Sequence, residues 1–334
     1  MRAAAAAPVQ MEDVARLAGV SMMTVSRAIR EPGKVATATR QRVADAIAKI
    51  GYVPNLTAGS LASNRSRIVS AIVPTIDNSI FAETVRGLSE TLALGGYQLM
   101  LGQTGYDENA EEALVAAFLG RRVDGMVVTG VSHSALTRQR LAQAGIPVVE
   151  TWDLTPRPID MVVGFSNRAA GREMARYLLA KGHRRIGFAG GGDDRTLARL
   201  AGFEAAVKRV HGAYLVRVLV AAGTSFTGGR EALSDLLDQD RKLQAIFFSN
   251  DALAVGALME CRRRGIPVPG GLAIAGFADL NIAAAVAPSL TSVQVGSRHI
   301  GSEAARMLLM RLEGKPIAQP IRDLGFSIIA RESA

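Results

Sequence analysis

The sequence predicts an all-α helix-turn-helix headpiece followed by an α/β core of two lobes, each built on a doubly wound parallel sheet. Helical spacing of apolar residues, with capping residues at the ends, marks residues 8–54. Beyond residue 67, short continuous apolar runs alternate with helical patterns, which is typical of parallel strands covered on both faces. At 334 residues, 49% of them hydrophobic, the chain is long enough for two or three domains.

The positive charge of the chain is concentrated near its start. The formal net charge is +9, and residues 1–67 hold ten Lys and Arg against four Asp and Glu, which accounts for +6 of it. A basic leading segment favours contact with phosphates, although a solvated surface would explain part of the excess.

The composition also indicates the cellular compartment in which the protein is expected. Cys261 is the only cysteine, which excludes an intramolecular disulfide and a cysteine-rich zinc site and fits a reducing cytoplasm. The run Ala3–Ala7 is too short for the core of a signal peptide, and no apolar stretch approaches the ~18 residues of a membrane span. We therefore expect a cytoplasmic protein without membrane contact, with residues 1–7 disordered.

A helix-turn-helix pattern lies between Met11 and Arg27. Ala15 is small enough for two helices to cross closely, Gly19 can adopt the positive φ that ends the first helix, and Ser21 can cap the second. Three apolar residues then form an inward stripe, namely Val20, Val25 and Ile29.

The opposite face of the second predicted helix points outward, where a recognition helix meets the major groove of DNA. The candidate DNA-contacting residues there are Ser21, Met22, Met23, Thr24, Ser26, Arg27 and Arg30. The alternative interpretation is an ordinary helical hairpin with a solvated basic face.

Apolar residues at helical spacing predict a third helix over residues 37–50, with Gly51 as its stop and Pro54 at the end of the headpiece. Residues 55–65 then join the headpiece to the rest of the chain. A segment this short, with Gly59 inside it, cannot form a stable helix alone.

Four short motifs follow one another along the first 55 residues: Thr24-Val-Ser-Arg27, Pro32-Gly-Lys-Val35, Thr39-Arg40 and Gly51-Tyr-Val-Pro-Asn55. Their order and spacing resemble those of the LacI family of bacterial transcription regulators, and the likeness runs from about Val9 to Phe326. The resemblance implies three parts: a DNA-binding headpiece over residues 8–54, a hinge over residues 55–66, and an effector-binding and dimerisation core over residues 67–334.

In that family the hinge is a helix that becomes ordered when two copies meet in the minor groove, where a leucine wedges between base pairs. Leu61 matches that leucine, and the resemblance places Asn55 and Ala62 among the DNA-contacting residues. Ala62 departs from the basic residue of many members, and Gly59 weakens the helix, so we expect the hinge to order only on DNA and in a dimer. A plain linker with an incidental leucine is the alternative.

The alternating apolar runs predict two series of strands, over residues 68–73, 97–101, 125–128, 147–149 and 161–163, and over residues 185–189, 216–220, 245–248 and 272–276. The resemblance implies a periplasmic-binding-protein-like core, with crossings between the lobes near Ser166, Ser292 and Leu324. Lobe one then covers about residues 67–165 and 293–323, and lobe two covers about residues 167–291. In such a fold a ligand lies between the lobes, at the carboxyl ends of the strands.

Polar and aromatic residues follow the predicted strands where such a cleft needs them. The candidate effector-binding residues are Asn78, Phe81, Tyr106, Thr129, His133, Trp152, Arg195, Arg199, Phe226, Asn250 and Asp279. The resemblance implies that Arg199 binds the effector, that Phe226 closes over it, and that Asn250 lies in the cleft while Asp251 caps the next helix. For each loop residue taken alone, the alternative to a ligand contact is a role in a surface turn or a helix cap.

One departure from the family suggests the class of effector. Ala278 stands where sugar-binding members often place an aspartate, so that contact is absent or moved to Asp279. A cleft of reduced acidity that keeps Arg195 and Arg199 suits an anion, because guanidinium pairs bidentately with carboxylate. Three segments, Val149–Asp153, Val163–Asn167 and Asp323–Phe326, also resemble the gluconate-repressor subgroup. We therefore predict a sugar-acid effector, gluconate first and 2-ketogluconate second.

No enzymatic constellation is recognisable in the sequence. Gly190-Gly-Gly192 lacks the spacing of a dinucleotide fingerprint, and the four histidines are not at metal-ligand spacing. We expect no catalysis, no metal and no cofactor. The expected partners are a near-palindromic operator DNA, a sugar acid and a second copy in a homodimer, with a tetramer as the larger alternative. Two other functions stay open, a corepressor-dependent regulator and a solute receptor for transport, although the latter would not need a basic headpiece.

Overall fold

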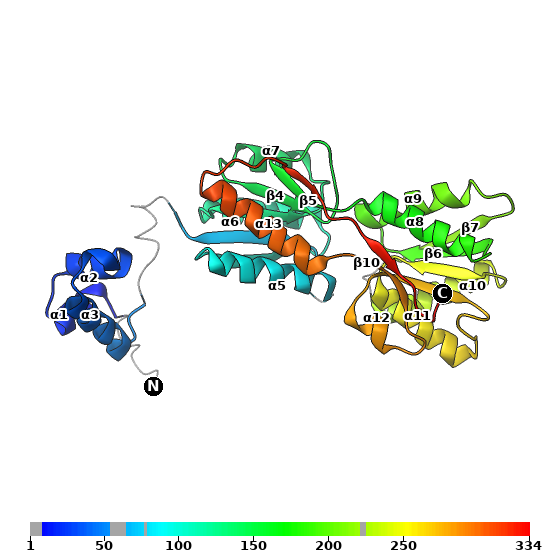
Figure 1. Cartoon of the computed structure of the whole chain (residues 1–334), viewed down its shortest axis with the longest axis horizontal. Coiled ribbons are helices and arrows are strands. Elements are labelled where there is room, and N and C mark those ends of the chain that lie inside the picture. The colour runs from blue at the N-terminus through cyan, green and yellow to red at the C-terminus, as the bar shows by residue number, and fades with distance from the viewer. Residues whose placement is uncertain (1–8, 54–64, 77–78, 221–224) are drawn as a thin grey trace, which may run out of the picture. The chain divides into compact units, whose positions relative to one another are not determined.

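The computed structural model describes residues 9–53, 65–76, 79–220 and 225–334 (Figure 1). The chain divides into two compact units, a headpiece that runs to Ser66 and a core from Arg67 to Ala334. Predicted site residues outside the described ranges are Asn55, Leu61, Ala62 and Asn78, together with the predicted disordered start and most of the predicted hinge. Among the helices that the structure describes, none is long and apolar enough to cross a membrane.

The headpiece consists of α1 (Met11–Ala18), α2 (Met22–Arg30), a 3-10 turn (Pro32–Lys34) and α3 (Thr37–Ile50). Gly19 ends α1 at φ 64° and Gly51 ends α3 at φ 66°, a left-handed conformation that glycine adopts readily. The Ser21 hydroxyl caps α2 by accepting a hydrogen bond from the Thr24 N–H at 3.2 Å. The capping residues predicted from the sequence are therefore confirmed.

Valine side chains from all three helices fill the core of the headpiece. Val14, Val25 and Val43 are at most 1% exposed. Val20 and Ile29 pack against this cluster and are partly buried. The predicted inward stripe is confirmed, and its burial leaves the other face of α2 to solvent.

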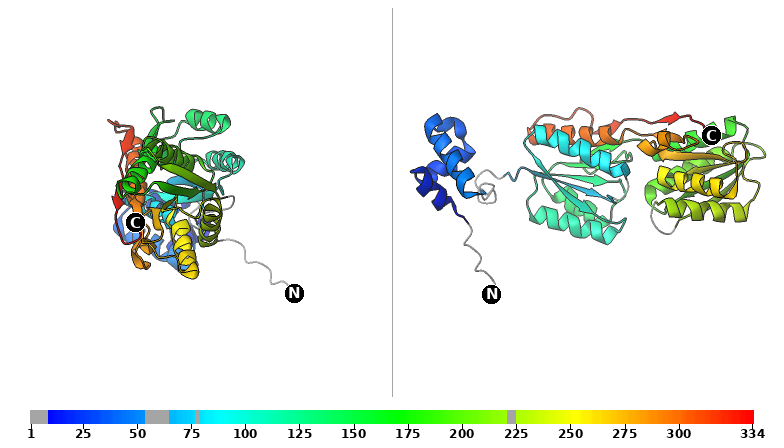
Figure 2. Two further views of the ribbon diagram at one scale, coloured as in Figure 1. Left: turned by 90° about the vertical axis from the view of Figure 1, so that its right-hand side faces the viewer. Right: turned by 90° about the horizontal axis from the view of Figure 1, so that it is seen from below.

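The strands of the first lobe are β1 (Ile68–Val73), β2 (Gln98–Gln103), β3 (Gly125–Thr129), β4 (Val148–Thr151), β5 (Met161–Gly164) and β11 (Ile321–Asp323). They form a parallel sheet in the order β11-β5-β4-β3-β1-β2. One face is covered by α5 (Ser79–Leu94) and α13 (Ser297–Leu312) and the other by α6 (Glu108–Gly120) and α7 (Ala135–Gln143) (Figure 2). The central strands are buried on both faces, which explains their continuous apolar runs.

The strands of the second lobe are β6 (Arg185–Gly190), β7 (Tyr214–Leu219), β8 (Ala245–Phe248), β9 (Ala273–Ala278), β10 (Thr291–Gln294) and β12 (Ser327–Ile329). Their order is β12-β10-β9-β8-β6-β7. On one face lie α8 (Asn167–Ala180) and α9 (Asp194–Val207); on the other lie α10 (Phe226–Gln239) and α11 (Asp251–Arg264), with the short α12 (Asn281–Ala285) nearby. Both lobes thus have the predicted layered α/β architecture.

The second sheet differs in one respect from the predicted parallel arrangement. Because β12 runs antiparallel to β10, the second sheet is not wholly parallel. β10 pairs with β9 and ends at Gln294, so the chain leaves the second lobe close to the crossing predicted near Ser292. The end of the chain also belongs to the second lobe, where the Ser333 carbonyl accepts from the Ile274 N–H at 2.8 Å. β11 and β12 are three-residue edge strands, whose pairing depends on tertiary contacts rather than on a local pattern.

Two glycines allow α8 and α9 to pack backbone against backbone. A Cβ on Gly171 would lie 1.9 Å from the Arg199 carbonyl oxygen, and a Cβ on Gly202 would lie 1.8 Å from the Arg168 carbonyl oxygen. No larger residue fits at either position without moving a helix. The close crossing brings the start of α8, at Asn167, next to the Arg199 side chain of α9.

Gly202→Ala should destabilise the core by about 1 to 3 kcal/mol, because the added methyl group forces the two helix backbones apart. Urea denaturation followed by circular dichroism measures the change in unfolding free energy. The matched control is Gly192→Ala, where a Cβ meets nothing within 4 Å. That variant should stay within about 0.5 kcal/mol of the parent. Equal stability of both variants would contradict the close crossing.

Candidate functional site

The outward face of α2 carries apolar side chains beside an arginine. Met22 is 53% exposed and Met23 is 71% exposed. Arg27 is exposed and forms no ion pair among the described residues, whereas the headpiece carboxylates of Asp13 and Glu31 pair with other cations. The surface of α2 therefore offers a free guanidinium and two methionines to a partner.

The remaining predicted residues of this surface have different roles. Ser21 and Thr24 are engaged with each other at the start of α2, where their hydroxyl oxygens lie 3.0 Å apart. Ser26 is partly buried. Arg30 is the last residue of α2, and its side chain lies outside the described part of the structure.

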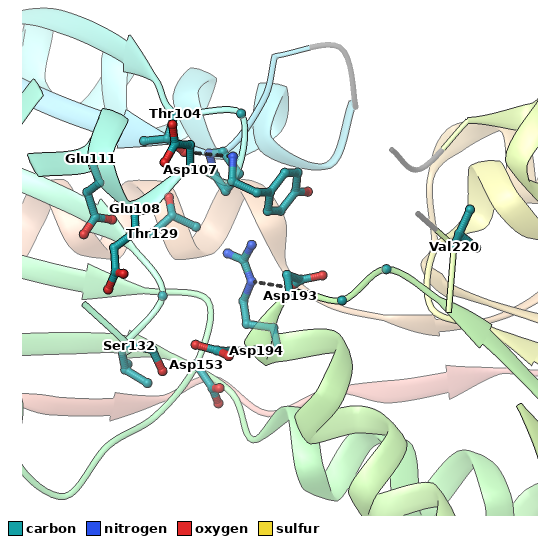
Figure 3. Close-up of a pocket in the computed structure, with 18 residues that line it drawn as sticks. Thr104, Asp107, Glu108, Glu111, Thr129, Ser132, Asp153, Asp193, Asp194 and Val220 are labelled. Carbon is teal, nitrogen blue, oxygen red and sulfur yellow. Dashed lines mark hydrogen bonds and ion pairs between the residues drawn. The ribbon is translucent and has the colours of Figure 1, made fainter. Parts of the chain in front are cut away.

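A cavity of about 470 Å³ lies between the two lobes of the core (Figure 3). From the first lobe it is lined by the loops after β2 and β3 and by Asp153 after β4; from the second lobe, by Gly191–Arg195 after β6 and by Val220 after β7. These are the carboxyl ends of parallel strands, as predicted, and this edge is where α/β sheets bind ligands.

The lining of this cavity is acidic, contrary to the prediction of reduced acidity. Six carboxylates line it, Asp107, Glu108, Glu111, Asp153, Asp193 and Asp194, against one cation, Arg195. Five of the six stand at helix starts. Asp107 caps α6 and Asp193 caps α9, and the other three lie in the first turns of these helices, where the positive end of the helix dipole stabilises them.

These carboxylates do not assemble into a metal centre. Within the part of the chain that the structure describes, no three His, Cys, Asp or Glu side chains converge as metal ligands. The acidic lining instead presents hydrogen-bond acceptors to the cavity.

Arg195 connects the two lobes at this cavity. Its Nε lies 3.4 Å from the Asp193 Oδ1, and its guanidinium carbon lies 5.3 Å from the ring centroid of Phe81 in the first lobe. Its Nη1 is buried and makes no hydrogen bond with the described residues. Arg195 therefore has a donor available beside the cavity.

Arg199 lies deeper, is not among the residues that line the cavity, and has neutral hydrogen-bond partners. It is 7% exposed, and it donates from Nη1 to the Asn167 Oδ1 at 2.5 Å and from Nη2 to the Thr196 Oγ1 at 2.9 Å. Its Nε is buried without a hydrogen-bond partner in the described residues. The guanidinium also stacks 4.1 Å from the ring centroid of Phe277. Burial lowers the pKa of Arg199 to about 10, partly offset by the charge of Asp193.

Asn167 links Arg199 to the first lobe and is a site residue that the sequence prediction missed. Its Nδ2 donates to the Trp152 carbonyl oxygen at 2.8 Å, while its Oδ1 accepts from Arg199. Asn167 is fully buried at the first position of α8, directly after the chain crosses between the lobes. Two signals in the sequence pointed to it: a polar residue next to a predicted crossing, and its place in the segment Val163–Asn167 that resembles the gluconate-repressor subgroup.

Aromatic residues form the wall around this hydrogen-bond chain. Trp152 is 2% exposed, and its backbone has a φ of 73°. Its Nε1 donates to the Thr84 Oγ1 at 3.2 Å. The centroid of its ring lies 5.2 Å from that of Phe81 and 6.1 Å from that of Phe165. Neither Trp152 nor Phe81 lines the cavity, because both side chains are buried in the hydrophobic core.

The other first-lobe candidates divide between the cavity and the interior. Tyr106 and Thr129 line the cavity, as predicted for effector contacts. His133 does not, because its side chain is fully buried, with Nδ1 2.8 Å from the Glu111 Oε1 and Nε2 3.6 Å from the Glu150 Oε1. Burial raises the pKa of Glu150.

A second cavity, of about 1200 Å³, lies where the chain crosses between the lobes. Phe226, 45% exposed at the start of α10, and Asp279 line it. The Asp279 carboxylate is already engaged, since its Oδ1 lies 2.7 Å from the Arg331 Nη2 and its Oδ2 accepts from the Gln294 Nε2 at 2.8 Å.

The capping role expected of Asp251 belongs to Asn250, and neither residue lines the cavity between the lobes. Asn250 is the cap of α11, with its Oδ1 accepting from the Ala252 N–H at 2.6 Å, and it is 4% exposed. Asp251 is fully buried and accepts from the Ser292 hydroxyl at 2.6 Å and the Leu280 N–H at 2.7 Å. Burial raises the pKa of Asp251 to about 7, and the neighbouring charge of Asp279 adds to the effect.

Asp251→Asn should reduce the dependence of core stability on pH. The pKa of Asp251 is about 7 in the folded chain and ~4 in the unfolded chain, so between these values the folded state holds the additional proton. The unfolding free energy contributed by Asp251 therefore falls as pH rises through this interval, and asparagine removes that fall. Urea denaturation at several pH values in this interval measures the slope. An identical slope in parent and variant would contradict the assignment.

Comparison with known proteins agrees with this architecture. Residues 10–55 match the model of bacterial regulatory proteins of the lacI family, and residues 175–334 match that of a periplasmic binding protein-like domain. The HTH-type transcriptional regulator GntR of Escherichia coli K12 is 36% identical over 319 residues, which cover 95% of this chain and 96% of that protein.

Two further relatives extend over nearly the whole chain. The regulator of the same name from Pseudomonas aeruginosa is 37% identical, covering 97% of this chain and 95% of that protein. The crystal structure of a LacI-family transcriptional regulator from Silicibacter pomeroyi superposes with a TM-score of 0.92 at 36% identity, covering 98% of this chain and 99% of that one. The chain therefore belongs to the LacI family of bacterial regulatory proteins and is a DNA-binding transcriptional regulator that resembles the gluconate-repressor subgroup.

Proposed function

We propose that this protein is a transcriptional repressor that a small sugar acid releases from its operator, with gluconate the first choice and 2-ketogluconate the second. The observation that carries the proposal is the buried guanidinium of Arg199, which has neutral hydrogen-bond partners and no ion pair among the described residues. A buried cation of this kind is costly until an anion offsets its lost hydration.

The acidic lining of the cavity fits the other end of the same ligand. A sugar acid carries one carboxylate and several hydroxyl groups, and hydroxyl groups donate well to carboxylates such as those of Asp153 and Asp194. The carboxylate would lie toward Arg199 and Arg195, and the hydroxyl groups toward the acidic lining. A neutral sugar satisfies the acidic lining but leaves the arginines without an anion.

The proposed contacts with DNA come from α2 and the hinge. Arg27 reads a base edge in the major groove, while Met22 and Met23 contact thymine methyl groups. Leu61 wedges into the minor groove. Two copies bind a near-palindromic operator as a homodimer, in the cytoplasm and without catalysis. Binding of the sugar acid between the lobes favours the arrangement with lower operator affinity.

Arg27→Ala should weaken operator binding by about 1 to 3 kcal/mol and relax base preference at one position, because a bidentate contact with a base edge is lost. Fluorescence anisotropy with a series of operator variants measures both effects. Lys49→Ala, which removes an exposed cation from α3, is the matched control and should leave base preference intact. If Arg27→Ala changes affinity equally for all sequences, Arg27 contacts only phosphates.

Gluconate or 2-ketogluconate should bind the protein and lower its operator affinity, whereas glucose should do neither. Arg199→Ala should abolish the response, since a buried carboxylate without its cation costs several kcal/mol. Calorimetry with the three ligands, followed by operator titration, tests this. Arg217→Ala, at a 60% exposed side chain of the same lobe, is the control and should respond as the parent does.

Two results would redirect this proposal. Tight binding of glucose without binding of either acid would exclude a sugar-acid effector and leave the regulator assignment in place. A sugar acid that raises operator affinity would make the protein corepressor-dependent.

A further inference from the structure

A strongly charged concavity lies in the second lobe, against α8 and α9. Figure 1 shows where these two helices lie in the fold. It is a groove of about 590 Å³. Five arginines line it, and no carboxylate does: Arg168, Arg172, Arg176, Arg184 and Arg209. We call it the arginine groove. Neither the DNA-binding surface nor the cavity between the lobes includes any of these residues.

Three of these arginines form a straight row along α8. Arg168, Arg172 and Arg176 are spaced by four residues, so they lie on one helix face at steps of about 6 Å. All three are exposed. Arg184 is fixed at the far end of α8, where its Nη1 donates to the carbonyl oxygens of Leu179 and His183 at 2.9 and 3.0 Å.

Little of this charge is compensated within the described chain. Arg172 and Arg176 share one carboxylate, that of Glu173, at 3.0 and 2.9 Å. Arg168 and Arg209 form no side-chain hydrogen bond or ion pair with the described residues. Five guanidinium groups and one neighbouring carboxylate thus leave a charge of +4 around a single groove.

The floor of the groove is made of short side chains. Gly202, Ala205 and Ala206 on α9 lie between the arginines of α8 and Arg209. The contact of Gly202 with the Arg168 carbonyl holds the two helices close at one end of this floor. The groove therefore combines a base of short apolar side chains with the arginines of α8, Arg184 and Arg209.

We propose that the arginine groove binds a small anion with two or three linked phosphate groups, of the class of inorganic triphosphate or a nucleoside polyphosphate. Guanidinium groups bind phosphate oxygens bidentately, and the absence of lysine from the lining favours this geometry over diffuse attraction. The volume lies in the range of small-molecule sites, about 300 to 1,000 Å³. Linked phosphates bring three or four negative charges into that volume, whereas a monocarboxylate brings one.

Calorimetric titration of the full-length protein with inorganic triphosphate, without magnesium and at fixed ionic strength, tests the proposal. The double variant Arg168→Gln/Arg209→Gln should weaken binding at least tenfold. The control Arg121→Gln/Arg122→Gln removes the same charge from exposed residues of the first lobe and should stay within twofold of the parent. A lysine pair, Arg168→Lys/Arg209→Lys, should recover part of the affinity.

Three outcomes would overturn the proposal. The first is the absence of saturable binding. The second is an equal loss of affinity in both glutamine double variants, which indicates general attraction to a basic protein. The third is tighter binding of hexaglutamate than of triphosphate, which indicates that the groove binds an acidic protein segment instead. Far-ultraviolet circular dichroism of each variant confirms that it is folded. Monophosphate in a parallel titration should bind at least tenfold more weakly than triphosphate, because it engages fewer of the arginines.

Discussion

The core of this regulator depends on a buried positive charge at the junction of its two lobes. Arg199 donates to Asn167, and Asn167 donates to the Trp152 carbonyl, so one hydrogen-bond chain joins a helix of the second lobe to a strand end of the first. The chain needs α8 and α9 to lie backbone against backbone, which Gly171 and Gly202 permit. Packing therefore positions the charge, and under the proposed function this charge pairs with the carboxylate of the effector.

The acidic lining and the buried arginine are consequences of the same architecture. In a doubly wound fold, helices begin at the carboxyl ends of the strands, so their caps and first turns face the ligand cavity. Asp107 and Asp193 are such caps, and the carboxylates that follow them are stabilised by the helix dipoles. The cation comes instead from farther along α9, where Arg199 is buried. A ligand with an anionic end and several hydroxyl groups complements both features.

The sequence predicted features that short-range chemistry determines. Gly19, Ser21 and Gly51 end or cap the headpiece helices as expected, and the runs over residues 68–73 and 245–248 form strands with those bounds. The prediction from sequence failed where contacts between distant segments, or the exact backbone conformation at a helix start, determine the structure. β12 pairs antiparallel because the chain returns to the second lobe, and Trp152 turns inward because Thr84 accepts its indole N–H. Asn250 takes the capping role expected of Asp251, a one-residue shift that backbone conformation determines.

A thermodynamic cycle between Arg199 and the ligand carboxylate tests whether these two groups pair. The affinities of gluconate and of its neutral amide are measured by calorimetry for the parent and for Arg199→Gln. Our expectation is that the parent prefers gluconate by at least about tenfold, which corresponds to ~1.4 kcal/mol, and that the variant binds both ligands alike. An undiminished preference for gluconate in Arg199→Gln would contradict it, because the carboxylate would then pair with some other group.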